Sequence, residues 1–138
     1  LEPRLWKPYR EECVQLGKPD PGPYPNQGPI FLWVSRDPAA DWEWLLPHVA
    51  HQIRSYGEWT VEAFGAAAGP FKGELDPEAI RRNPAYRVVT PEEALAVAEE
   101  LGPNGVFHLN PLLAGIDPSR ARRMLDLYER EVDPYLPR

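Results

Sequence analysis

One stretch near the carboxyl end constrains the fold most: an apolar run, a turn closed by proline, and an amphipathic helix. Residues 105–109 follow a Gly-Pro-Asn-Gly turn and form an apolar run that predicts a buried strand. The run ends at Asn110 and Pro111, because proline has no N–H to donate to a sheet ladder. Asp117 then offers a helix N-cap and Pro118 a first helical residue. A strand, a loop and a helix in this order make half of a β/α repeat.

The predicted helix has one apolar face, and the predicted strand ends in polar groups. Apolar side chains recur at helical spacing at Ala121, Met124, Leu125, Tyr128, Val132 and Tyr135. His108 and Asn110 lie at the carboxyl end of the strand, where β/α barrels place their catalytic groups. We therefore expect both side chains to face a ligand. The alternative for His108 is a core histidine that hydrogen-bonds to backbone.

The order of residues in this stretch resembles the last strand and helix of the luciferase-like flavin-dependent oxidoreductases. The similarity consists of His-x-Asn-Pro-Leu-Leu-x-Gly-Ile-x-Pro at 108–118 and Leu-x-Leu-Tyr-x-x-x-Val-x-Pro-x-Leu at 125–136. That family folds as a (β/α)8 barrel, so the resemblance implies that this stretch is the eighth unit. A Thr-Pro-Glu-Glu helix precedes the last strand of the family, as residues 90–93 do here, which extends the resemblance from Ile30 onward.

The chain is too short to be a complete barrel. It has 138 residues, whereas a (β/α)8 barrel typically needs about 250. It begins with Leu1, so we expect a fragment, a processed product or a trimmed polypeptide that forms a single domain over residues 1–138. The expected fold class is α/β: the last two β/α units and a helical insertion of a (β/α)8 TIM barrel, helix-rich with a short parallel sheet.

Charge and composition argue against several partners. With 15 Lys and Arg against 21 Asp and Glu, the net charge is -6, and no basic surface is available for nucleic acid. No apolar run reaches the length of a membrane span, and no signal peptide opens the chain. The single Cys13 cannot form an internal disulfide, so we expect a reducing, cytoplasmic setting. Cys13 lies on the apolar stripe of a helix predicted over residues 5–16, which favours a buried residue over a reactive thiol.

The next predicted elements are a strand and a long helix. Residues 30–35 are apolar on both faces until Ser35, as in a parallel strand covered on both sides, and Arg36 follows the strand. Asp37 and Pro38 begin a helical pattern that continues to about Phe64, and Pro47 inside it should kink or split the helix. Its core stripe is Trp42, Leu45, Leu46, Val49, Ile53 and Tyr56. A second stripe on the opposite side is Trp44, His48, His51, Ser55 and Trp59.

The second stripe has two interpretations. Its indoles can pack on a neighbouring element while its imidazoles are satisfied by hydrogen bonds. Alternatively, this face overhangs a ligand cavity, because tryptophan stacks on planar rings and imidazole transfers protons. In the resembled family, the segment after the seventh strand lies over the mouth of the active site. His48 and His51 are three residues apart but lack a third ligand, so we predict no metal.

The remaining segments are shorter. Residues 18–29 and 65–75 are rich in proline, glycine or alanine and predict loops. Asp76 begins a short helix that Asn83 ends, and residues 86–89 are a short extended candidate. Thr90 opens a capping box that begins a helix with a stop at Gly102.

The resemblance implies a function. It predicts the C-terminal part of a flavin-dependent luciferase-like monooxygenase, in which FMN or a deazaflavin performs hydride or oxygen chemistry on a small-molecule substrate. The family's flavin is held largely by earlier strands, so we expect these residues alone to be inactive and to bind flavin weakly or not at all, and we assign no cofactor-binding residue. The catalytic candidates are His51 and His108, and the substrate-binding candidates are Ser35, Arg36, Tyr56, Trp59 and Asn110.

The alternative is a non-catalytic binding or oligomerisation module derived from the same fold, with a Trp-rich surface as its interface. In either case we expect residues 30–35 and 106–109 to run parallel and adjacent. A two-stranded sheet is marginal in water, so we also expect a homo-oligomer or association with the rest of the barrel.

Overall fold

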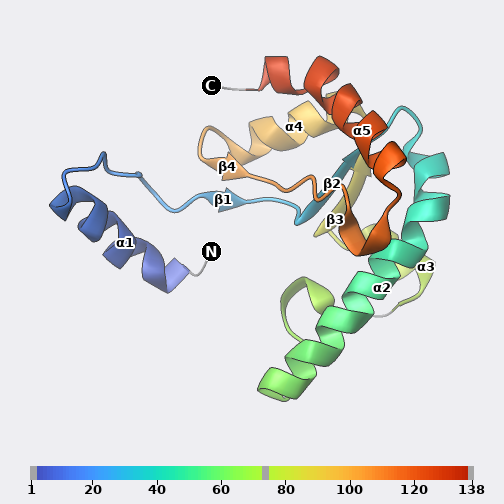
Figure 1. The fold of residues 1–138 in the computed structure, drawn as a ribbon, viewed down its shortest axis with the longest axis horizontal. Coiled ribbons are helices and arrows are strands. Elements are labelled where there is room, and N and C mark those ends of the chain that lie inside the picture. The colour runs from blue at the N-terminus through green and yellow to red at the C-terminus, as the bar shows by residue number, and fades with distance from the viewer. Residues whose placement is uncertain (1–2, 73–74, 137–138) are drawn as a thin grey trace.

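The computed structural model describes residues 3–72 and 75–136, and it is a mixed α/β fold, rich in helix, with short parallel strands (Figure 1). Its α-helices are α1 Pro3–Gln15, α2 Pro38–Phe64, α3 Pro77–Arg82, α4 Pro91–Leu101 and α5 Pro118–Glu131. Its strands are β1 Asn26–Gln27, β2 Phe31–Val34, β3 Tyr86–Val89 and β4 Gly105–Val106. Short 3-10 helices lie at Gly69–Phe71, Leu113–Gly115 and Asp133–Tyr135.

β2 is the central strand. β3 pairs with it in parallel over its full length, with Phe31 opposite Tyr86. On the other side, β1 and β4 pair in parallel, and backbone hydrogen bonds extend this pairing to β2. His108 N donates to Pro29 O at 3.0 Å, and Leu32 N donates to His108 O at 2.7 Å. The two predicted strands therefore run parallel, but they meet only through the hydrogen bonds of His108 and do not share a ladder. β2 pairs with β3, which the sequence indicated only as a short extended segment, and β4 pairs with β1.

The position of β3 bears on the predicted barrel. A (β/α)8 barrel closes when successive strands follow one another around the sheet. Here β2 lies between β3 and residues 106–108, both of which follow it in the chain, and the described strands do not close on themselves. The observed class is mixed α/β with a short parallel sheet, and the barrel fragment stays a prediction.

α2 is a single helix from Pro38 to Phe64. The Asp37 carboxylate accepts the N–H of Ala40 at its start, and Gly65 ends it in the left-handed conformation, at φ 78°. The predicted split at Pro47 is wrong. Proline removes the hydrogen bond to the carbonyl of Glu43, but both residues are exposed, so water can satisfy that carbonyl.

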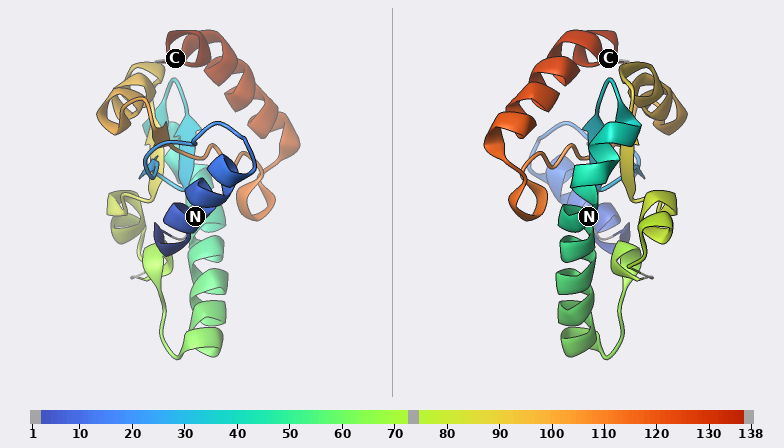
Figure 2. Two further views of the ribbon diagram at one scale, coloured as in Figure 1. Left: turned by 90° about the vertical axis from the view of Figure 1, so that its left-hand side faces the viewer. Right: turned by 90° about the vertical axis from the view of Figure 1, so that its right-hand side faces the viewer.

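The central strand is covered on both faces. All four side chains of β2 are buried, as the sequence predicts for a parallel strand covered on both sides. α2 packs against β3, while α4 and α5 pack against β2. Figures 1 and 2 show that the far half of α2 extends beyond the strands. The buried core includes Phe31, Leu32, Trp33, Leu45, Val49, Ile80, Tyr86, Ile116, Met124 and Val132.

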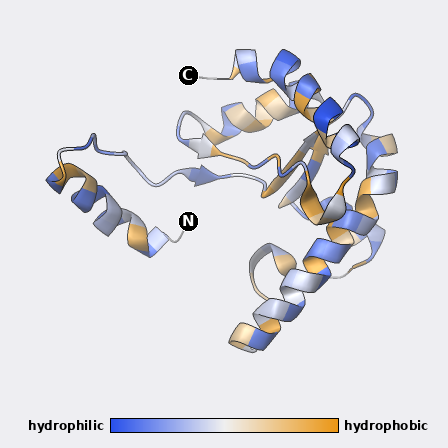
Figure 3. Ribbon diagram, viewed as in Figure 1, coloured by the Kyte–Doolittle hydropathy of each residue, from blue (hydrophilic) through white to orange (hydrophobic). Residues whose placement is uncertain are grey.

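α1 lies apart from this body (Figure 1). It is held by the loop that follows it: Trp6 Nε1 donates to Gly22 O at 3.0 Å, and Arg10 pairs with Asp20 at 2.6 Å. Cys13 is buried, as predicted. Figure 3 shows hydrophobic residues on α1 and on the far end of α2, away from the apolar centre of the molecule. Among residues 3–72 and 75–136, no helix is both long and apolar enough to cross a membrane.

Candidate functional site

A cleft of about 580 Å³ opens at the carboxyl end of β2. Trp33, Ser35 and Arg36 reach it from the strand and the residues that follow, while Asp41 and Trp44 reach it from the first turns of α2. Open α/β sheets bind ligands outside the carboxyl ends of their strands, and this volume is within the range of small-molecule sites. The opposite wall is α5, which contributes Arg120, Arg123, Met124, Asp126, Leu127 and Arg130. We name this cleft the cationic cleft.

Asp41 fixes the aromatic wall of the cationic cleft. One carboxylate oxygen accepts the indole N–H of Trp33 and the other accepts that of Trp44, each at 2.9 Å. The two indoles meet edge to face, with ring centroids 5.3 Å apart. The Arg120 guanidinium lies 4.3 Å from the centroid of the Trp44 ring, within the range of a cation–π contact. Asp41 and Arg120 therefore fix the two indoles without a ligand.

Ser35 and Arg36, two of the predicted substrate-binding residues, both line the cationic cleft. Ser35 is buried; its N–H donates to Val89 O at 2.8 Å and its hydroxyl accepts the N–H of Asp37 at 3.0 Å. Ser35 therefore shapes the turn between β2 and α2. The exposed Arg36 forms an ion pair with Glu131 at the end of α5. That pair joins the two sides of the cleft.

The charge of the cationic cleft comes from α5. Arg120, Arg123 and Arg130 have no carboxylate within ion-pair distance among the residues that the structure describes. Arg123 makes only a long contact, 3.5 Å, with the Ser119 hydroxyl. Sequence reasoning missed these arginines. The available signal was their spacing of three and seven, which puts them on one flank of the apolar stripe of α5.

His108 and Asn110 do not reach the cationic cleft. His108 hydrogen-bonds through its backbone to Pro29, which precedes β2, and to Leu32, the second residue of β2. Ser35 lies about five residues further along, or roughly 16 Å at about 3.3 Å per residue. The two strands are therefore staggered, and their carboxyl ends do not share one edge. Both His108 and Asn110 are exposed, and Asn110 has a positive φ of 46°.

The second stripe of α2 divides into two parts. Trp44 and His48 pack on the body, and His48 Nδ1 lies 2.9 Å from Ala114 O, which makes this nitrogen a donor. His51 is exposed. Tyr56 and Trp59 lie together on the far half of the helix, with ring centroids 4.9 Å apart, and Tyr56 also stacks on Phe71 at 4.8 Å. The packing interpretation is therefore confirmed for His48, whereas Trp44 both packs on Trp33 and lines the cationic cleft.

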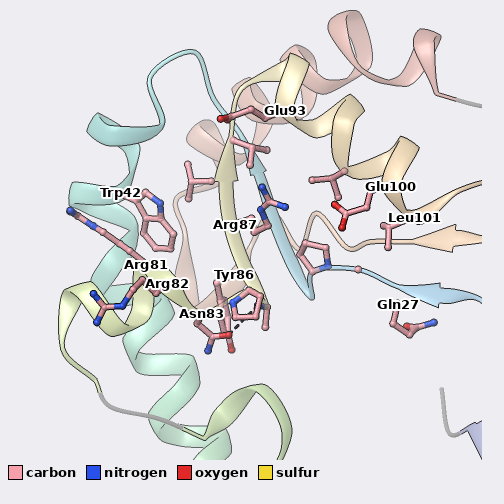
Figure 4. A pocket seen from close by; sticks show the side chains of 17 residues that line it. Gln27, Trp42, Arg81, Arg82, Asn83, Tyr86, Arg87, Glu93, Glu100 and Leu101 are labelled. Atoms are coloured by element: carbon pink, nitrogen blue, oxygen red, sulfur yellow. Dashed lines mark hydrogen bonds between the residues drawn. The ribbon is translucent and has the colours of Figure 1, made fainter.

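A second cavity, also of about 580 Å³, lies along β3 and contains none of the predicted site residues. Figure 4 looks onto β3 with β2 behind it, α2 and α3 on one side and α4 on the other. Burial raises the pKa of Tyr86, whose hydroxyl has no hydrogen-bond partner among the described residues, so this phenol stays neutral. Arg81, Arg82, Arg87, Glu93 and Glu100 give the cavity its charges.

Within residues 3–72 and 75–136, no cluster of three or more His, Cys, Asp or Glu side chains could hold a metal ion. Comparison of the chain with protein-family models, with curated proteins and with solved structures gives no match. The candidate site is therefore defined by its own geometry, a cationic and aromatic cleft at the carboxyl end of β2.

Proposed function

We propose that the cationic cleft binds the phosphate group of a ligand, and that the chain is the C-terminal part of a larger flavin- or deazaflavin-dependent oxidoreductase. The observation that carries the first part is the set of three α5 arginines that have no carboxylate within ion-pair distance in the described chain. Guanidinium groups bind phosphate oxygens through charge-assisted, often bidentate hydrogen bonds. The second part rests on the resemblance of residues 108–136 and on the parallel β/α arrangement.

In this proposal the residues of the cleft bind and orient. Arg123 and Arg130 hold the phosphate, while Arg120 is positioned by Trp44. The Arg36–Glu131 pair holds α5 against the end of β2 and so sets the width of the cleft. A bound flavin would supply the hydride or oxygen chemistry, and earlier strands of the parent would hold its ring.

His51 and His108 stay our candidates for proton transfer, and Tyr56, Trp59 and Asn110 our candidates for substrate contact, in that parent. All five are exposed in the described chain. They do not line the cationic cleft, so they belong to the proposal only if other parts of the parent bring a substrate to them.

The phosphate site is tested by comparing FMN with riboflavin, which lacks the phosphate. We expect FMN to bind weakly but at least about tenfold more tightly than riboflavin, which corresponds to about 1.4 kcal/mol. The double variant Arg123→Ala/Arg130→Ala should remove that difference. The double variant Arg54→Ala/Arg82→Ala removes the same charge from exposed positions outside the cleft and should preserve it. Equal binding of FMN and riboflavin would contradict the phosphate site.

The oxidoreductase assignment has a separate test. A polypeptide extended upstream of Leu1 should purify with the absorbance of a flavin, or take it up on titration. A colourless extended polypeptide that binds FMN no more tightly than the 138-residue chain does would contradict the enzyme while leaving the phosphate site standing.

The second candidate function is an assembly module, and exposed aromatic residues favour it. Trp59 is 59% exposed and Phe64 is 79% exposed on the far half of α2. Exposed apolar patches mark interfaces when they are contiguous. Sedimentation at micromolar concentration should then show a species larger than 15.7 kDa, and Trp59→Ser/Phe64→Ser should return it to the monomer.

A further inference from the structure

The outer edge of β3 is unpaired. β3 is the outer strand of the sheet, and no strand of the described chain pairs with its other side. On the opposite edge, the start of β2 is paired with His108. An unpaired edge presents backbone N–H and C=O groups that can pair with another strand, and proteins usually cover such edges.

The hydrogen-bond register identifies the groups that this edge offers. Phe31 N donates to Ala85 O at 3.1 Å and Ser35 N donates to Val89 O at 2.8 Å. In a parallel ladder every second residue of a strand hydrogen-bonds to a given neighbouring strand, so the backbone groups of residues 85, 87 and 89 bond to β2. Tyr86 and Val88 therefore direct their peptide groups outward. The N–H of Tyr86 donates to Asn83 O. The groups that can pair with a further strand are therefore the carbonyl of Tyr86 and the N–H and carbonyl of Val88.

The edge lies at the bottom of a groove. The cavity of about 580 Å³ is lined by all of β3, by Glu93, Val97 and Glu100 from α4, and by Trp42 and Arg81 from α2 and α3. Figure 4 shows β3 with α4 on one side and α2 and α3 on the other. A single extended segment has the shape to enter such a groove, whereas the equally recessed β3 of a second copy would be stopped by the helices of both copies.

Arg87 gives the groove a charge preference. It is the one charged side chain of β3, it is half-buried, and no described carboxylate lies within ion-pair distance of it. Figure 4 shows it extending from β3 toward α4. Glu93 is occupied by the capping box, where its carboxylate accepts the Thr90 N–H at 2.8 Å. A carboxylate on the incoming segment would pair with Arg87, whereas a second copy would bring Arg87 near Arg87.

We infer that the β3 groove binds an extended acidic segment of another polypeptide, which adds as a strand to the outer edge of β3. Main-chain hydrogen bonds to Tyr86 and Val88 supply the affinity, and a carboxylate opposite Arg87 supplies the specificity. Side chains of a strand alternate between faces, so this carboxylate must lie on the face of the segment that is turned toward α4.

The probe is a capped peptide of alternating threonine and valine with a central glutamate. Added to the full 138-residue chain, it should slow hydrogen exchange of the Val88 amide and shift the NMR signals of β3. The same peptide with a central lysine should bind about tenfold more weakly, and N-methylation of its backbone should abolish binding.

A charge swap makes the test specific. Arg87→Glu should reverse the preference, so that the lysine peptide binds better than the glutamate peptide. Arg82→Glu, an equal reversal at an exposed position of the same groove, should not reverse it. Arg87→Gln, with folding checked by circular dichroism, should bind both peptides alike. Three results would overturn the inference: no binding at millimolar peptide, equal binding of both peptides by the native chain, or no protection of Val88.

Discussion

Helices α1 and α5 have the same kind of sequence and different surroundings. Both carry apolar side chains at helical spacing, but α5 buries Ala121, Met124 and Leu127 against the body, whereas α1 leaves Leu5 60% exposed and Val14 57% exposed. α1 contacts mainly its own following loop. The difference shows that an apolar stripe favours burial of one face of a helix. Whether that face is buried depends on another part of the chain, or another molecule, packing against it.

The largest expected contrast is between truncating a buried side chain of α5 and truncating an exposed apolar side chain of α1. Met124 is 3% exposed, so Met124→Ala should lower the free energy of unfolding by about 2–5 kcal/mol through lost burial and a cavity. Leu5→Ala in α1 should change the free energy of unfolding by less than about 0.5 kcal/mol, because Leu5 is exposed. Urea denaturation measures both. If Leu5→Ala were as destabilising as Met124→Ala, another part of the protein or a second molecule would have to cover α1 in solution.

The next largest effect is expected on thermal stability, from removing the N-cap of α5. The Asp117 carboxylate accepts the N–H groups of Ser119 and Arg120, and the Ser119 hydroxyl hydrogen bond is the main reason that the pKa of Asp117 is lowered. Because the folded pKa lies below the unfolded one, the stabilisation is complete above the unfolded pKa and is lost as the pH falls through the folded pKa. Asp117→Ala should therefore lower the melting temperature at pH 7. That loss should shrink toward zero in strong acid.

Removing the contacts between α1 and its following loop should change hydrogen exchange in α1 alone. Trp6→Ala removes the hydrogen bond to Gly22 and the edge contact with Tyr24, whose ring centroid lies 5.7 Å away. Amides of α1 should then exchange faster with solvent, because helices of this length are marginal when isolated. Amides of β2 and α5 should keep their protection. Loss of protection in β2 would mean that α1 belongs to the cooperative core.

The smallest effect is on one carboxyl group. The side-chain hydrogen bond from Arg10 lowers the pKa of Asp20 to about 2. Arg10→Ala should raise the titration midpoint of Asp20 toward its ordinary value in an NMR titration. The Arg10–Asp20 contact stabilises the link between α1 and its loop above the ordinary pKa, and this is lost as the pH falls through about 2. A midpoint that does not move would mean that the pair does not form in solution.

Much of the candidate site was beyond the reach of sequence reasoning, and the reason is register. Ser35 and Arg36 were predicted as site residues and do line the cationic cleft. His108 was placed with them on the assumption that strand ends coincide. The backbone pairs of His108 with Pro29 and Leu32 stagger the strands instead. Nothing in a single sequence specifies how far one parallel strand slides along another when both are apolar on two faces.

The pairing of β3 illustrates the same limit. Residues 86–89 are short, and their neighbours hold the turn and cap signals, so the sequence indicates an extended segment without indicating its partner. α2 and α3 connect β2 to β3 in the chain, and the packing of these helices brings β3 beside β2. The α5 arginines were visible in the sequence as a regular spacing, but only the position of α5 beside β2 makes them a site.

The sequence by itself determined where helices α2 to α5 begin. Asp37 before Pro38, Asp76 before Pro77, Thr90 before Pro91 and Asp117 before Pro118 each cap a helix in the structure as the residues predict. These interactions span three or four residues, so the local chain holds all the atoms they need. Only the tertiary structure decided which apolar stripe is covered, how β2 and residues 106–108 are staggered, and which arginines share a cleft. Those outcomes depend on contacts between residues far apart in the chain, where many arrangements bury similar apolar area and packing and register select one.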